Sequence, residues 1–137
     1  MATHTVRPIL LALVLCDSVI REAGTNKLSL IGTFNGIFAN TFPMVHHSLC
    51  VYIAITEGRG RMACKLRMTA LESNAVIFEL PGEIEFGGPT NVGEMVFQWN
   101  QVRFERPGVY AFEFWVGNDL LGSRKLHAQL LQQPPPK

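Results

Sequence analysis

Residues 106–131 constrain the fold more than any other part of the chain. The Pro-Gly pair at 107–108 favours a turn, because proline presets φ and glycine tolerates positive φ. The run 109–116 alternates in polarity and size, and residues 117–119, Gly-Asn-Asp, have the chemistry of a hairpin turn. Side chains two apart share one face of a strand, here those of Tyr110, Phe112, Phe114 and Val116. The sequence therefore predicts a C-terminal β-hairpin with an aromatic inner face.

The same pattern of strand-like runs and turn residues continues through the rest of the chain. Alternating or apolar runs separated by turn residues cover residues 8–16, 28–39, 48–56, 62–71, 75–80 and 94–104. No amphipathic helical pattern of useful length interrupts them. About eight short strands with regular turn signals are typical of a sandwich of two sheets. We expect an all-β fold, an antiparallel β-sandwich of immunoglobulin-like or C2-like plan, as a single domain over residues 1–131 with a short Pro-rich tail at 132–137.

Three local features sharpen this expectation. Gly32 predicts a bulge or bend within the run 28–39. Pro81-Gly82 is expected to end one strand, with residues 83–86 forming a short separate one. In the run 94–104, alternation predicts two faces, one with Val96, Val102 and Phe104 and the other with Met95, Phe97 and Trp99.

Composition limits the classes of partner. The chain is 47% hydrophobic and 17% charged, whereas about 25% charged residues are usual in globular domains. Sparse charge leaves less polar cover for the surface, so we expect part of that surface to be buried in an oligomer or against a protein partner. The net charge of +1 does not resemble the strongly basic field of nucleic-acid-binding proteins.

The three cysteines, Cys16, Cys50 and Cys64, are widely spaced within apolar runs and predict buried free thiols, which indicates a reducing, cytoplasmic location. The apolar run 9–16 also resembles a short signal peptide that ends in a lipoprotein cysteine. However, it is too short to span a bilayer, and Leu15 stands where a lipoprotein signal needs a small residue. We therefore predict a central strand there and no membrane association.

Catalytic and metal-binding patterns are weak. His46 and His47 are adjacent, so an extended backbone would point them to opposite faces, and no third ligand follows at a recognisable spacing. Asp17 and Asp119 are the only aspartates and lie far apart, which argues against a calcium site. A Cys/His nucleophile pair would lack an orienting third residue. We expect no cofactor, no metal and no enzymatic activity.

Two features are candidate interaction sites. Four cations fall in one turn and on the outward face of the strand that follows, and they could bind an anion or an acidic partner: Arg59, Arg61, Lys65 and Arg67. The alternative is an edge strand that basic side chains protect against unwanted pairing. Trp115 falls on the face opposite the aromatic run of its strand, so it is a candidate interface residue unless it belongs to the core.

A family resemblance rests on four segments. Residues 16–20 (CDSVI), 27–34 (KLSLIGTF), 42–43 (FP) and 107–110 (PGVY) resemble a family of small bacterial proteins known only as a domain of unknown function. The resemblance extends from about residue 10 to residue 130. It implies a compact β-sandwich of bacterial origin and carries no catalytic residue or cofactor to transfer.

Together these observations favour a non-enzymatic interaction or structural module that self-associates in the cytoplasm. The alternative is a module that binds a small ligand or a carbohydrate, either with loops at one end of the sandwich or with an aromatic sheet face. Fold alone does not choose between them, because sandwiches carry many functions.

Overall fold

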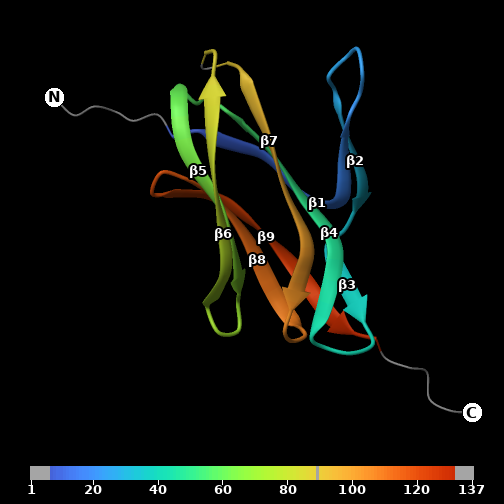
Figure 1. Ribbon diagram of the computed structural model, residues 1–137. Coiled ribbons are helices and arrows are strands. Elements are labelled where there is room, and N and C mark those ends of the chain that lie inside the picture. Colours follow the sequence, from blue (N-terminus) through green and yellow to red (C-terminus); the bar gives the residue numbers. More distant parts are fainter. Residues whose placement is uncertain (1–6, 89, 132–137) are drawn as a thin grey trace, which may run out of the picture.

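The computed structural model describes residues 7–88 and 90–131, which form nine strands and no helix (Figure 1). The predicted all-β fold is confirmed. The strands are β1 (Ile9–Arg21), β2 (Leu28–Thr33), β3 (Gly36–Ala39), β4 (Met44–Thr56), β5 (Gly60–Ala70), β6 (Ala75–Phe86), β7 (Val92–Phe104), β8 (Gly108–Val116) and β9 (Asp119–Leu130).

The strands belong to two sheets. Sheet A has the order β2-β1-β4-β7, and all of its pairs are antiparallel. Sheet B has the order β3-β9-β8-β5-β6. The β1–β2 hairpin extends beyond the rest of sheet A, at the upper right of Figure 1. Within the described residues no helix is present that could cross a membrane.

Alternate side chains of both sheets build one hydrophobic core. The apolar residues that share one face of β4 are fully buried, as are those that share one face at the centres of β5 and β8: Leu49, Val51, Ile53, Ile55, Leu66, Met68, Phe112 and Phe114. Rings from different sheets meet in this core, with Phe97 of β7 6.5 Å from Phe114 of β8 between ring centroids. The alternation predicted from sequence therefore identifies the core positions correctly along these strands.

One strand pair departs from the predicted antiparallel arrangement. After Thr33 the chain leaves sheet A, and β3 joins sheet B parallel to the end of β9, in register Gly36 with His127. Gly32 adopts φ +71° just before this crossing, so the bend expected there is present. Apolar content cannot reveal the crossing, because a strand buries the same residues in either sheet.

The predicted strand end at Pro81-Gly82 is wrong. β6 runs without interruption from Ala75 to Phe86, with Lys65 opposite Pro81 and Cys64 opposite Gly82. β6 is the outermost strand of sheet B, so Pro81, which lacks an N–H, is tolerated where a central strand would lose a hydrogen bond.

The predicted division of β7 into two faces is also wrong. Gln101 adopts φ +62° and interrupts the alternation, so Val102 and Phe104 are buried together with Phe97. Val96, which was expected on their side, is exposed. A positive φ at a non-glycine residue has no clear sequence signal.

The C-terminal hairpin is confirmed. β8 and β9 are antiparallel neighbours joined at Gly117, which has φ +57°, and Tyr110, Phe112, Phe114 and Val116 are all buried. The apolar run 9–16 is part of β1, as predicted. His4 and the Pro-rich tail at 132–137 lie outside the described residues.

Candidate interaction surfaces

The four predicted cations lie on β5 and in the turn before it, and carboxylates of β6 accompany them. Arg61 Nε is 2.6 Å from Glu83 Oε1, and Arg61 Nη2 is 3.6 Å from Glu85 Oε2. Arg67 forms an ion pair with Glu79 at 2.5 Å. Arg59 is exposed in the turn that precedes β5. The outer face of β5 and β6 therefore carries alternating charges rather than a purely positive field.

Trp115 lies on the same face as these cations. The cation patch and Trp115, which were predicted as two separate sites, therefore belong to one surface. Its register partner on β5 is Lys65, whose Nζ lies 5.4 Å from the centroid of the indole ring. Arg67 Cζ lies 5.1 Å from the same ring. The indole N–H donates a hydrogen bond to Glu113 Oε1 at 3.3 Å. The ring is half-buried, because these neighbours cover part of it.

This arrangement limits what Trp115 can do. Cations over an aromatic face are attracted to its negative π-cloud, and their aliphatic stems cover apolar ring surface. A sugar that stacked on this ring would have to displace Lys65 or Arg67. The part of sheet B around Lys65, Arg67 and Trp115 is thus a polar surface with one partly covered aromatic side chain.

The outer face of sheet A is different, because apolar side chains dominate it. Strands β1, β4 and β7 bring two cross-strand rows into register, Ile9 with Thr56 and Val92, and Val14 with Tyr52 and Val96. Their alternating neighbours point into the core, so these rows point away from it. We call the following five residues the sheet A patch: Ile9, Val14, Tyr52, Val92 and Val96.

Little charge accompanies the sheet A patch. Glu94 lies beside Ala54, and its Oε2 accepts a hydrogen bond from the Tyr52 hydroxyl. The pKa of Tyr52 is raised to about 12, mainly by burial and secondly by this hydrogen bond to Glu94. This surface is absent from the sites predicted above, although the runs 8–16 and 48–56 are apolar on both faces, which is the signal that could have found it.

A pocket of about 650 Å³ opens at one end of the fold, where the β5–β6 and β7–β8 turns lie close together (Figure 1). Tyr110 donates a hydrogen bond from its hydroxyl to the backbone oxygen of Arg106, at 2.6 Å, and so fixes the β7–β8 turn. The apolar wall consists of Ala70, Ala75, Ile77, Pro107, Val109 and Tyr110. The polar lining consists of Glu72, Ser73, Arg103, Glu105 and Arg106. Its size is in the range of small-molecule sites, about 300–1,000 Å³.

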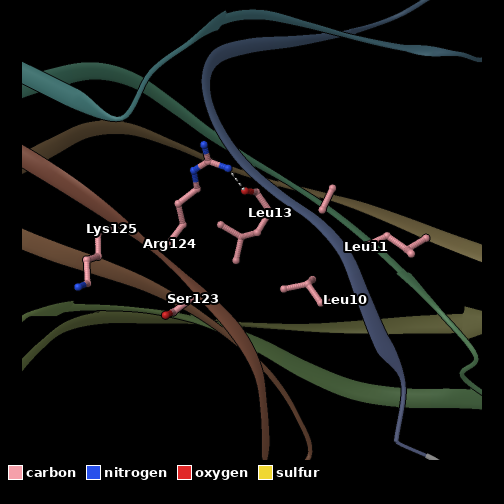
Figure 2. Close-up of a pocket in the computed structure, with 7 residues that line it drawn as sticks. Leu10, Leu11, Leu13, Ser123, Arg124 and Lys125 are labelled. Atoms are coloured by element: carbon pink, nitrogen blue, oxygen red, sulfur yellow. Dashed lines mark hydrogen bonds between the residues drawn. The ribbon is translucent and has the colours of Figure 1, made fainter.

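A second cleft, of about 510 Å³, lies between β1 and β9 (Figure 2). Leu10 and Leu13 point towards β9, whereas Leu11 points the other way. Arg124 spans the cleft and donates a hydrogen bond from Nη1 to the backbone oxygen of Leu13, at 2.9 Å. The cleft is the gap between the edges of the two sheets, and Arg124 closes part of it.

The remaining histidine, aspartate and cysteine candidates form no metal site within the described residues. His46 Nε2 is 3.5 Å from Asp17 Oδ1 and packs against the ring of Phe34, with centroids 5.2 Å apart. Across residues 7–88 and 90–131, no three histidine, cysteine, aspartate or glutamate side chains gather as a metal site would require. Cys16, Cys50 and Cys64 are buried free thiols, as predicted.

The comparison with protein families agrees with the resemblance seen in the sequence. The chain matches the sequence model of a family of unknown function, DUF6941, over residues 11–129. The protein belongs to this family. The match covers every strand almost completely, from β1 to β9. No curated protein matches the chain.

Proposed function

We propose that this DUF6941 protein is a non-enzymatic interaction module that self-associates through the sheet A patch. The observation that carries the proposal is an apolar surface across three neighbouring strands, in which Val92 and Ile9 are about half exposed, at 54% and 47%. Contiguous exposed apolar surface is rare on monomers and is typical of interfaces.

A second copy of the chain is the occupant that this surface fits best. The sheet A patch itself contains no charged residue, and the neighbouring Glu94 carboxylate accepts a hydrogen bond from Tyr52, so few charges would lie between two copies. A face-to-face contact of this kind has the twofold symmetry that is commonest among homo-oligomers. The net charge of +1 adds almost no long-range repulsion between copies.

Sedimentation equilibrium over a wide range of protein concentration tests the proposal. We expect the unmodified protein to form a dimer or larger assembly, and Val92→Lys and Val96→Lys to shift it towards monomer. Val76→Lys is the matched control, because Val76 is an equally exposed valine, at 52%, on the edge strand of sheet B. A monomer at every concentration, or equal dissociation by the control, would contradict the proposal.

The end pocket supports a second candidate, a module that binds a small ligand. Its apolar wall beside Arg106 and Glu72 suits a small amphipathic molecule with a charged group. A thermal-shift screen with amphipathic carboxylates and amines tests this, since a ligand at about 100 times its Kd adds roughly 2.7 kcal/mol to stability. Arg106→Ala should abolish a carboxylate shift, whereas Arg21→Ala, on the distant β1–β2 arm, should not. The absence of any shift would remove this candidate.

The partly covered Trp115 gives less support to carbohydrate binding on the sheet B face. A stable Trp115→Ala variant with unchanged assembly would leave this face without a role as an interface. Altered assembly would instead make Trp115 part of the contact between copies.

The architecture and location are inferred in the same way. A shared core between a four-stranded and a five-stranded sheet supports a β-sandwich of immunoglobulin-like plan, in which the chain crosses from sheet A to sheet B between β2 and β3. Three buried free thiols support a reducing compartment such as the bacterial cytoplasm. Localisation of a tagged full-length chain in its native host tests that placement.

A further inference from the structure

Two of the three cysteines face each other across neighbouring strands. Cys16 on β1 and Cys50 on β4 are direct register partners in an antiparallel pair. Residues paired in this way have Cα atoms about 4.5 or 5.5 Å apart, depending on the hydrogen-bonding pattern. Both separations lie within the range of about 4.4–6.8 Å that disulfides span. Cross-strand partners also project to the same face, so the two thiols lie on one side of sheet A.

The surroundings of the pair isolate it from solvent and from the third cysteine. Cys16 and Cys50 are 0% and 1% exposed, and Cys50 Sγ lies 3.7 Å from the backbone oxygen of Asp17. The pKa of Cys16 is raised mainly by burial and secondly by the Cys50 thiol, whose contribution reflects how close the two thiols are. Cys64 is in sheet B, where its Sγ lies 3.4 Å from Met95 Sδ.

We propose that Cys16 and Cys50 form an oxidisable dithiol, and that peroxide converts it into a disulfide that joins β1 to β4. One thiol ionises, its thiolate attacks a peroxide oxygen, and the O–O bond breaks to give a sulfenic acid and hydroxide, which takes up the proton from the thiol and becomes water. The second thiol then attacks that sulfur, the S–O bond breaks, and the S–S bond forms with release of a second water. Two thiols and one hydrogen peroxide thus give one disulfide and two waters.

The same structure predicts how the reaction behaves. Because only thiolates react and burial raises the pKa of both thiols, oxidation of the folded protein should be slow and should accelerate at alkaline pH. The closed loop would contain β2 and β3, including the crossing between sheets. Restricting this loop in the unfolded chain should raise Tm by about 10 °C.

Peptide mapping of the full-length protein provides the test. Reduced protein is treated with hydrogen peroxide for several hours, unfolded, alkylated with iodoacetamide and digested, and each cysteine is then identified by mass spectrometry. We expect a linked pair of peptides that contain Cys16 and Cys50, with Cys64 alkylated. Cys64→Ser should form the same link, whereas Cys16→Ser and Cys50→Ser should form no intramolecular disulfide.

The mapping of the unmodified protein decides the question even where a serine variant fails to fold. A link that involves Cys64, or alkylation of all three cysteines after oxidation both in buffer and in mild denaturant, would overturn the proposal. So would a Cys16–Cys50 link that leaves Tm unchanged or lowers it, since the strands would then not be joined in their native register.

Discussion

Arg124 on β9 donates a hydrogen bond from Nη1 to the backbone oxygen of Leu13 on β1, at 2.9 Å, between residues 111 positions apart in the chain. Its Nε and Nη2 donate to Asn35 Oδ1 at 3.0 and 2.8 Å. Asn35 lies in the link between β2 and β3. One side chain therefore connects β9 with β1, as Figure 2 shows, and with the segment that crosses between the two sheets.

Replacement of Arg124 should destabilise the fold without abolishing it. Arg124→Met keeps most of the aliphatic stem but removes three hydrogen bonds made by a charged donor, so we expect a loss of about 2 kcal/mol in the free energy of unfolding. Urea denaturation measures it. The neighbouring exposed Lys125 is the control, since Lys125→Met should change stability by less than about 0.5 kcal/mol. Equal effects of the two variants would show that the hydrogen bonds of Arg124 do not stabilise the fold.

Gly58, in the turn between β4 and β5, should not tolerate a side chain. A Cβ atom there would lie 2.5 Å from Cδ2 and Cζ of Phe86, whose ring is buried and has little room to move. We expect Gly58→Ala to lower the free energy of unfolding by about 2 kcal/mol. Gly88→Ala is the control, because a Cβ there would meet nothing closer than Asn91 Oδ1 at 4.0 Å. Chemical denaturation of both variants distinguishes overpacking from a general cost of replacing glycine.

Sequence periodicity predicts this fold well wherever the backbone is regular. The core-facing side chains of β4, β5 and β8 recur at every second position, and a period of two leaves no freedom once the register of one face is set. The prediction is wrong at Gln101 on β7, where the backbone is irregular, and at Pro81 on β6, where an edge position lets a regular strand continue through proline. A local φ value or an edge position in a sheet depends on distant strands, which composition does not encode.

The candidate surfaces were likewise predictable from the sequence only in part. The sequence places Lys65, Arg67 and Trp115 on outward faces, but only the pairing of β5 with β8 brings these side chains together. The end pocket is lined by two turns, at residues 71–74 and 105–107, and the whole of β6 and β7 lies between them in the chain. Likewise, Cys16 and Cys50 become neighbours only through the register of β1 with β4. Long-range register was the missing information in each case.

The two tryptophans should respond differently to truncation. Trp115 is half-buried under two cations, so Trp115→Ala should cost about 2 kcal/mol and leave a folded protein. Trp99 packs against the core, with its ring 4.4 Å from Phe78 and 6.4 Å from both Phe97 and Phe112, so Trp99→Ala should cost about 3 kcal/mol or more. Urea denaturation of both variants gives the comparison. A larger loss at Trp115 would assign it to the core.

Alkaline pH should destabilise the protein through Tyr52. Burial and the contact with the Glu94 carboxylate raise the pKa of this phenol to about 12, above its ordinary value of 10.0. Below pH 10 the phenol is protonated in both the folded and the unfolded chain, so its contribution to stability is fully present. Between pH 10 and 12 the unfolded chain releases the proton while the folded protein retains it. The free energy of unfolding must therefore fall as pH rises through this window.

Two variants isolate this effect. Tyr52→Phe should show a shallower fall in stability above pH 10 than the unmodified protein, because it has no phenol to titrate at that position. Glu94→Gln keeps the phenol but removes the carboxylate that disfavours its ionisation, so the pKa of Tyr52 should decrease towards its ordinary value. Urea denaturation at several pH values, together with ultraviolet titration of tyrosinate, measures both quantities. Burial raises the pKa of Cys64 to about 11 in the same direction, so a Cys64→Ser background separates the two groups. Identical pH profiles for the unmodified protein and Tyr52→Phe in that background would exclude Tyr52 as the source of the alkaline instability.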